Sequence, residues 1–308
     1  MGRTLLIILT GLSVSFSIFA ISRNRRIVEA ADQLATKFES VSATNAASSG
    51  VLMALNQLYQ DDTWRNGYSN LVLNGDTISV SVEDFNTNPL LSPNEIRLLA
   101  TARNQPYQSS VEALVFDGTF NGFAVWAKDT VMFVTTLDTL GVVSPDLLMQ
   151  QAPFMPDIDQ AQLILEAGNQ GHQIDASSNP DSTFTPPSGY PNNNFYFAGQ
   201  TPNVVYVQGN LRIAKNRIIY GIYLVDGDVR LDNNATVEGI VYTPNRKRSI
   251  YNSNAHISHV NGGIVSWGKI KGSYGTIEVR LVPEYMDRFV GNFVPRNPPL
   301  RVISWKQF

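Results

Sequence analysis

A charge-free apolar run near the N-terminus constrains this chain more than any other feature of its sequence. The run extends from Leu5 to Ile21 and reads LLIILTGLSVSFSIFAI. As a helix it would be about 25 Å long, near the lower limit for crossing a bilayer. Gly11 and three serines are small, and small residues let another helix approach closely within lipid. The run therefore predicts a membrane helix that packs against copies of itself or against partner helices.

The large apolar side chains of this run, together with Gly11, form the predicted assembly surface. A helix that is apolar on all sides is stable only where lipid or protein covers it. Burial of these side chains is therefore the expected driving force for assembly. The predicted assembly residues are Leu5, Leu6, Ile8, Leu9, Gly11, Leu12, Phe16 and Phe19.

Two other interpretations of the run are open. It has the layout of a cleaved signal peptide, with Arg3 before the apolar core and the small-x-small sequence Ala20-Ile21-Ser22 at its end. A buried helix of a soluble domain is the other alternative. The following segment favours retention, because Ile27–Tyr59 contains no proline and its apolar residues recur every three or four positions. A signal peptide has no need to continue into such a helix.

That segment predicts one helix of nearly sixty residues, about 85 Å long, starting in the apolar run. Gly50 interrupts its apolar stripe at a cost of about 1 kcal/mol relative to alanine. The stripe consists of Ile27, Ala30, Ala31, Leu34, Phe38, Val41, Val51, Leu52, Leu55 and Leu58. The basic residues Arg23, Arg25 and Arg26 follow the run, and the positive-inside rule would keep the C-terminal part in the cytoplasm.

The segment after the helix is typical of an antiparallel sheet. Asn74-Gly75 separates two β-prone runs, at 71–73 and 77–82, and this is a strong hairpin signal. Further strands are expected at 95–102 and 110–116, and the apolar segment 120–136 predicts more strand. A long helix followed by an antiparallel meander is an α+β arrangement.

These pieces resemble type IV pilin-like proteins, in particular minor pilins of the PilX kind. The matching parts are the apolar N-terminal helix, the segment 47–55 with Tyr59 and Trp64, and the strand 77–82. The resemblance implies an assembly helix, a body that faces outward from the cell, and pilin-like subunits as partners. The run differs from a typical pilin helix in carrying no acidic residue, since the fifth residue after Gly2 is Ile7.

An internal repeat begins at Val204. The segment 206–211 (YVQGNL) matches 224–229 (LVDGDV), and Gly221 and Gly239 are also 18 residues apart. A third match, at 260–265, follows an insertion that contains Asn245–Arg248. Short alternating strands with glycine at recurrent corners predict a β-solenoid with rungs of about 18 residues. The pattern looks like the β-helical domains of PilX-like proteins and, more distantly, bactofilins.

The expected fold is therefore α+β, in four parts. Residues 1–62 form the apolar anchor and long helix, and residues 63–140 form an antiparallel, pilin-like sheet. Residues 141–203 form a linker with short helices at 144–151, capped by Ser144, and at 161–167, followed by a loop. Residues 204–308 form the β-solenoid, whose last segments, 281–297 and 300–308, cap it or pair with a strand edge.

Composition excludes several function classes. With 23 basic and 26 acidic residues the chain lacks the basic field of a dedicated nucleic-acid binder. It contains no cysteine, which rules out disulfides, thiolate zinc sites and a cysteine nucleophile. No phosphate-binding loop, zinc motif or Gly-x-Ser-x-Gly elbow is present. No cofactor, metal or catalytic residue is therefore predicted.

The remaining polar residues favour structural roles. The acid pairs Asp226/Asp228 and Asp157/Asp159 are interpreted as solvated turns rather than as Ca²⁺ ligands or glycosidase acids. His172 is expected in a solvated loop. The basic segment 245–248 is expected to be a solvated insertion in a rung.

His256 and His259, three apart in an expected strand, should point to opposite faces and share no metal.

The sequence thus predicts a membrane-anchored, non-enzymatic pilin-like subunit, major or minor, of a filament at the cell surface. Its β domain would face solvent and meet a surface or a carbohydrate ligand. Two alternatives remain, an exported β-helical carbohydrate-active enzyme and a membrane-bound, bactofilin-like polymer former oriented by Arg23–Arg26.

Overall fold

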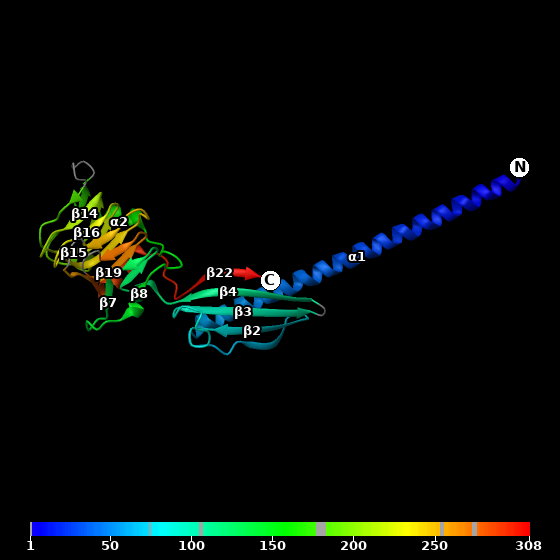
Figure 1. The fold of residues 1–308 in the computed structure, drawn as a ribbon, viewed down its shortest axis with the longest axis horizontal. Coiled ribbons are helices and arrows are strands. Elements are labelled where there is room, and N and C mark those ends of the chain that lie inside the picture. The colour runs from blue at the N-terminus through cyan, green and yellow to red at the C-terminus, as the bar shows by residue number, and fades with distance from the viewer. Residues whose placement is uncertain (1, 74, 105–106, 177–182, 253–255, 273–275) are drawn as a thin grey trace. The chain divides into compact units, whose positions relative to one another are not determined.

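The structure is a computed structural model that describes residues 2–73, 75–104, 107–176, 183–252, 256–272 and 276–308. Side chains are described for these residues except 2–7 and 104. The chain divides into two compact units, residues 1–117 with 300–308 and residues 118–299. Unit 2 is therefore inserted into unit 1 between two strands of its sheet (Figure 1).

Unit 1 is built on one uninterrupted helix, α1, from Gly2 to Gln60. This confirms the continuous N-terminal helix that the proline-free sequence predicts. Its C-terminal half lies along a five-stranded antiparallel sheet, whereas its N-terminal half extends beyond the sheet (Figure 1). One helix thus has a C-terminal half that the sheet covers and an N-terminal half, here called the bare half, whose exposed apolar residues extend to Val41.

The sheet of unit 1 has the strand order β1-β2-β3-β4-β22, antiparallel throughout. Leu73 pairs with Asp76 across Gly75, as the Asn-Gly hairpin signal predicts. The strands are β1 (Tyr68–Leu73), β2 (Asp76–Glu83), β3 (Glu95–Asn104), β4 (Tyr107–Asp117) and β22 (Leu300–Gln307). Their alternating burial shows one face on α1 and one toward solvent.

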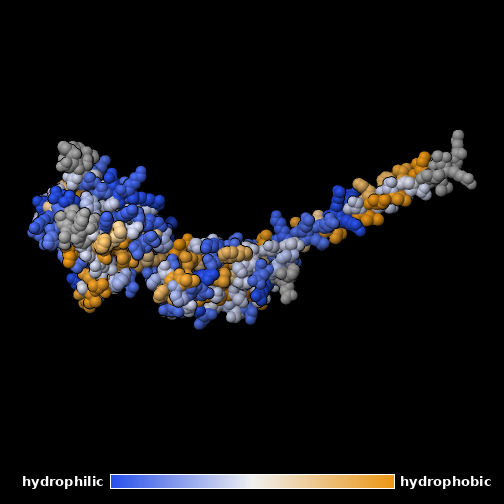
Figure 2. Space-filling model, in the orientation of Figure 1, coloured by the Kyte–Doolittle hydropathy of each residue, from blue (hydrophilic) through white to orange (hydrophobic). Residues whose placement is uncertain are grey.

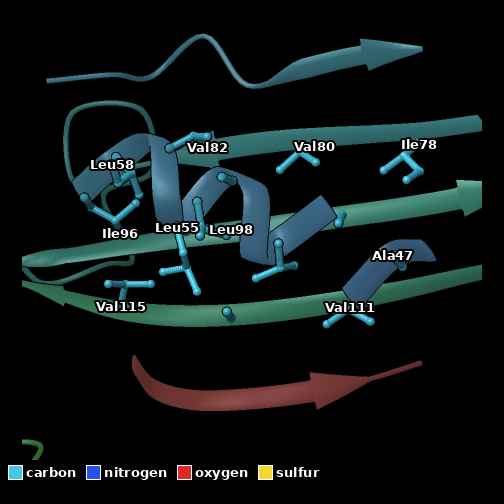
Figure 3. Close-up of a cluster of buried hydrophobic side chains, with 14 of the residues drawn as sticks. Ala47, Leu55, Leu58, Ile78, Val80, Val82, Ile96, Leu98, Val111 and Val115 are labelled. Atoms are coloured by element: carbon cyan, nitrogen blue, oxygen red, sulfur yellow. The ribbon is translucent and has the colours of Figure 1, made fainter. Parts of the chain in front are cut away.

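The core of unit 1 is the interface between α1 and this sheet (Figure 3). Leu55 and Leu58 of the helix lie over Ile96, Leu98 and Val115 of the strands. Small residues line the contact on both sides and let the backbones approach closely; they are Ala46, Ala47, Gly50 and Ala54 on α1 and Ala100, Ala102 and Ala113 on the sheet.

Gly50 is one of these contact residues and does more than interrupt the predicted stripe. A Cβ atom there would lie 2.8 Å from Cγ2 of Ile78 and 3.3 Å from Cβ of Ala100. Of the predicted stripe, Val51, Leu55 and Leu58 are buried, whereas Leu52 is 58% exposed and the large apolar residues from Ile27 to Val41 are also exposed. The buried face follows alanine instead, because close helix–sheet packing selects small residues.

The last residues of the chain complete the sheet of unit 1. β22 pairs with β4, with Leu300 opposite Asp117, and Tyr59 donates to the carbonyl of Leu300 at 2.8 Å. Residues 300–308 pair with a strand edge as predicted, but the edge belongs to the sheet of α1 and not to the solenoid. The structure therefore differs from the expected domain ranges 63–140 and 204–308.

Unit 2 is a β-solenoid of parallel strands, as the repeat predicts. One wall has the strand order β9-β13-β15-β17-β19-β21-β7, and a second has β10-β14-β16-β18-β20-β6. The first wall consists of β9 (Gln173–Asp175), β13 (Val204–Gln208), β15 (Ile218–Val225), β17 (Thr236–Thr243), β19 (Ser258–Ser266), β21 (Ile277–Leu281) and β7 (Val134–Leu137). The second consists of β10 (Thr183–Phe184), β14 (Asn210–Ile213), β16 (Val229–Leu231), β18 (Ile250–Asn252), β20 (Ile270–Gly272) and β6 (Val131–Met132).

The predicted rung length of 18 residues holds for the first rungs. Ile222 faces Ile240, and Leu211 faces Val229. From β17 to β19 the offset grows, so that Ile240 faces Gly263, because residues inserted before β18 and β19 lengthen that rung. Inward Val, Ile and Leu side chains are fully buried along the stack.

A ladder of glycines marks one corner of the solenoid. Gly221, Gly239 and Gly262 face one another in successive rungs and have φ values of +107°, +151° and +143°. A Cβ atom on Gly239 would lie 1.9 Å from the carbonyl oxygen of Gly221. Only glycine combines this backbone conformation with such close stacking.

Residues early in unit 2 close one end of the stack. β5 (Val125–Ala127) pairs in parallel with β19 and with β8 (Leu148–Met149), and β7 pairs with β21. The strands predicted at 120–136 therefore belong to the solenoid and not to an antiparallel domain. η1 (Phe120–Gly122) precedes β5.

The predicted linker, 141–203, is part of unit 2. The helix predicted at 144–151 is a short 3₁₀ turn, η2 (Pro145–Leu147), and Ser144 makes no side-chain cap. The second predicted helix is present as α2 (Gln160–Asn169), capped by Asp159, and it packs on β13. The expected loop contains β9, β10 and the hairpin of β11 (Tyr196–Ala198) with β12 (Thr201–Pro202), while residues 177–182 lie outside the described part.

α3 (Pro283–Phe293) covers β19 with Met286, Phe289 and Phe293.

The register of α1 on its sheet can be tested with two leucines. Leu55→Ala should lower the free energy of unfolding of unit 1 by about 2–5 kcal/mol, because it leaves a cavity in the core. Leu52→Ala should change it by less than about 0.5 kcal/mol, because that side chain contacts solvent. Hydrogen exchange of β2–β4 amides in the full chain measures both; equal effects would contradict the register.

The glycine ladder can be tested at Gly239. Gly239→Ala should destabilise unit 2 by about 4 kcal/mol or more, because the new methyl group meets the backbone of the preceding rung. Gly291→Ala in α3 is the control, since no atom lies within 4 Å of its added Cβ. The measurement is hydrogen exchange of β15–β19 amides, and full protection in Gly239→Ala would refute the close stacking.

Candidate functional site: the bare half of α1

The bare half of α1 carries the largest exposed apolar surface of unit 1. Large apolar side chains on every side of the helix, from Ile8 to Val41, are about half to three-quarters exposed. They are Ile8, Leu9, Leu12, Val14, Phe16, Ile18, Phe19, Ile21, Ile27, Val28, Leu34, Phe38 and Val41. Figure 2 shows hydrophobic residues clustered toward the N-terminal end of the helix and a hydrophilic stretch after them.

The structure places the predicted assembly residues on this surface where it describes their side chains. Exposure is 58% for Ile8, 62% for Leu9, 54% for Leu12, 68% for Phe16 and 67% for Phe19. The side chains of Leu5 and Leu6 lie outside the described set, although both residues are in α1. At Gly11 no atom lies within 4 Å of an added Cβ, so the face beside it is open.

The serines of the run do not make this surface polar. The Ser15 hydroxyl donates to the carbonyl of Gly11 at 2.9 Å, and the Ser17 hydroxyl donates to Ser13 at 2.9 Å. Each hydroxyl hydrogen is therefore used inside the helix. At these two positions the run presents small side chains whose hydroxyl donors are already paired within the helix.

A band of charge follows the apolar part. Arg23, Arg25 and Arg26 are exposed, and Glu29 and Asp32 follow within two turns. Across the helical residues with described side chains, which begin at Ile8, no stretch combines the length and apolarity that a membrane crossing requires.

The bare half of α1 is an exposed apolar surface. Exposed apolar area costs about 25 cal/mol per Å² relative to burial, and no segment among the described residues of unit 1 covers it. A helix apolar around its whole circumference is stable where other helices or lipid surround it.

Unit 2 offers a second candidate site, a groove of about 620 Å³ on the second solenoid wall. Its floor is a ladder in which Arg212, Arg230 and Tyr251 face one another in successive rungs, and Lys271 continues this ladder in the next rung, outside the groove. Arg212 and Arg230 both bind the carboxylate of Asp232, at 2.8 Å and 2.9 Å. The groove is also lined by Thr183, Asn210 and Asp228. Sequence analysis missed this ladder, although the rung alignment places Arg212 opposite Arg230.

The predicted acid pairs have structural partners. Asp226 accepts a hydrogen bond from the Tyr206 hydroxyl at 2.6 Å; burial, together with this carboxylate, raises the pKa of Tyr206 to about 12. Asp228 accepts from the backbone of Ser249 at 2.7 Å. Asp159 caps α2 through the backbone of Gln162, and Asp157 is exposed. Asp226 lies in a bend between β15 and β16, and Asp157 and Asp159 lie in the irregular segment before α2.

The histidines are separate. His259 lies 3.3 Å from Glu278 in the neighbouring strand, whereas His256 is in a bend before β19 and not in a strand. His172 was predicted to be solvated, but it is half-buried between the rings of Tyr190 and Phe197, and burial lowers its pKa. Among the described residues no group of three or more His, Asp or Glu side chains could hold a metal ion.

The basic segment 245–248 forms an exposed turn of the lengthened rung. Arg246 lies over the ring of Trp267, 4.6 Å from its centroid, and Arg248 lies 3.7 Å from Asp228. These contacts hold the insertion against the solenoid.

Comparisons with known proteins add little to this geometry. No protein-family model matches the chain. No curated protein matches it either. Among solved structures, the competence-associated pilin ComZ from Thermus thermophilus aligns over 88% of this chain and 98% of its own, with a TM-score of 0.27 and 10% identity. Agreement at that level carries no functional argument, so the proposals below rest on the geometry.

Proposed function

We propose that this chain is a pilin-like structural subunit of an extracellular filament, assembled through the bare half of α1. The observation that carries the proposal is the division of α1, with one half buried on a sheet and the other apolar and bare. Such a helix joins a folded body to a bundle of like helices. Its partners would be copies of itself or other pilin-like subunits.

The same helix would hold the subunit in a membrane before assembly. The charge-free run from Leu5 to Ile21 supports this stage. The body would then face outward in spite of Arg23–Arg26, and the assembled protein would lie at the cell surface. The role is structural, as a major or a minor component, and involves neither catalysis nor a cofactor.

The groove of unit 2 favours a ligand for the exposed body, and we propose an acidic glycan. Guanidinium groups bind carboxylates in a planar, bidentate manner. A tyrosine between basic residues offers an apolar ring face, while Thr183, Asn210 and Asp228 supply hydrogen-bonding groups for sugar hydroxyls.

The enzyme alternative finds less support in the same unit. Asp226 and Asp228 are engaged by Tyr206 and Ser249, and Asp228 is the single acid among the described residues that line the groove. A cytoplasmic, bactofilin-like polymer would use the solenoid for assembly and leave the bare half of α1 in the membrane. Protease accessibility of unit 2 on intact cells separates this alternative from a surface filament.

Assembly through α1 can be tested at Gly11. Gly11→Leu should abolish filaments or reduce them at least about tenfold, because the bulky side chain keeps neighbouring helices apart. Its own chain tolerates the substitution, since no atom lies within 4 Å of the added Cβ. Electron microscopy of producing cells measures assembly, and hydrogen exchange checks that the sheet stays folded.

Gly11→Ala is the matched control, and it should assemble far better than Gly11→Leu. Unchanged filament formation by Gly11→Leu would show that this face is not used in packing. Finding the mature wild-type protein without residues 1–22 would refute the assembly proposal as a whole.

The glycan proposal can be tested with alginate, a polyuronate, as the probe. Arg212→Gln and Tyr251→Ala should each weaken alginate binding about tenfold, because each removes a contact of the groove floor. Lys215→Gln is the control, an exposed lysine outside the groove. Equal binding of neutral dextran, or preferential binding of duplex DNA, would contradict the proposed ligand class.

A further inference from the structure

A small pocket in unit 1 lies where the bare half of α1 reaches the sheet. It has a volume of about 210 Å³ and is bounded by Phe38, Val41 and Asn45 of α1 and by Leu73 and Asp76 of the β1–β2 hairpin. An apolar hollow along Leu34, Phe38 and Val41 continues from it down the bare half. The pocket therefore lies at the end of the bare half of α1 that is nearest the sheet.

Asp76 in the wall of this pocket has an unusual environment. Its side chain is 1% exposed, and one carboxylate oxygen accepts from the Ser42 hydroxyl at 3.0 Å. The other oxygen, Oδ1, is buried and has no hydrogen-bond partner among the residues that the structure describes. A buried carboxylate with a single neutral donor is poorly compensated, so a cationic donor entering the pocket would satisfy it.

An arginine side chain fits the pocket better than a lysine or a metal ion would. Its apolar stem can pack on Phe38 and Val41, while its guanidinium has several N–H groups for one carboxylate. A single carboxylate with one hydroxyl is a poor set of ligands for a divalent cation, which prefers six or more oxygens.

The chain itself carries such arginines on α1, between the apolar run and the pocket. Arg23, Arg25 and Arg26 are exposed on α1, but about 26 Å of straight helix separates Arg25 from Ser42. They cannot reach Asp76 of their own chain. The arginines of a second copy can, provided that the two helices run parallel with an axial offset.

One axial offset between two parallel helices places an arginine beside Asp76 and also brings their exposed apolar side chains together. If Arg23 of one copy lies level with Ser42 of another, the helices are shifted by 19 residues, about 28 Å. The same shift places residues 12–22 of the first copy beside residues 31–41 of the second. Exposed Phe16 and Phe19 then meet the hollow along Leu34 and Phe38.

We propose that the Asp76 pocket receives an arginine of the 23–26 cluster from a neighbouring copy and so sets the axial offset between subunits. This inference rests on the proposed assembly through α1. It adds a specific contact and an axial register between subunits. Experiments can refute either of them even if the subunits assemble through α1.

The contact is tested by Asp76→Asn, which keeps the shape and the Ser42 partner but removes the charge. The free subunit should become at least as stable as wild type, since a poorly compensated buried carboxylate is lost. Assembly should fall about tenfold, since the incoming arginine loses its partner. Asp32→Asn, the same change at an exposed acid on the same helix, is the control and should change neither property.

The register is tested by cross-linking, which is clean because the chain has no cysteine. Cells that produce Asn24→Cys and Asn45→Cys copies together should yield a mixed dimer with a short bismaleimide. Asn24→Cys with Leu34→Cys should give at least about tenfold less, because these positions lie about 13 Å apart along the axis at this offset, against about 3 Å for positions 24 and 45.

The outcomes separate the two proposals. Filaments that form normally in Asp76→Asn, or that cross-link equally well through position 34, would overturn the arginine contact and its register but leave assembly through α1 intact. Failure of the wild-type chain to assemble at all would instead remove the proposed function. Reduced assembly with a stable free subunit and selective cross-linking at position 45 supports the inference.

Discussion

The contact between α1 and its sheet determines the rest of unit 1. Alanines and Gly50 bring the helix backbone close to β2, β3 and β4, and the leucines at the end of the helix fill the space that remains. Because the sheet covers only the second half, the first half is held out as a rigid extension of a folded core. Its apolar character becomes a property of the subunit's surface and not of its interior.

The sequence predicted the elements of this arrangement better than their connections. Proline-free periodicity predicted one long helix, and Asn-Gly predicted the β1–β2 hairpin, since both signals are local. The covered face of α1 was misplaced at Leu52, because a stripe of large residues suggested the interface while close packing had selected alanine and glycine. No local signal indicated that Leu300–Gln307 would pair with β4, about 180 residues earlier in the chain.

The candidate site could likewise be predicted from the sequence only in part. Residues from Ile8 to Phe19 could be chosen from the sequence, because a charge-free apolar run of this length is typical of a membrane or assembly helix, a signal peptide or a buried helix. Asp76 could not, since its carboxylate matters only through its burial beside Ser42, and that depends on how the hairpin docks on the helix. The Arg212–Arg230 ladder was in principle visible, because the repeat fixes which residues of successive rungs face each other. His172 was misjudged because its aromatic neighbours are distant in sequence.

The insertion of unit 2 between β4 and β22 has a consequence for the order of synthesis. The strand that completes the sheet of unit 1, β22, is made only after all of unit 2, so β4 stays an open edge while the solenoid is being synthesised. Nascent chains would carry a nearly complete sheet with one unpaired side, which is prone to join other chains. A stop codon at position 300 would thus spare the rungs of unit 2 and yet leave unit 1 with an exposed, aggregation-prone strand edge.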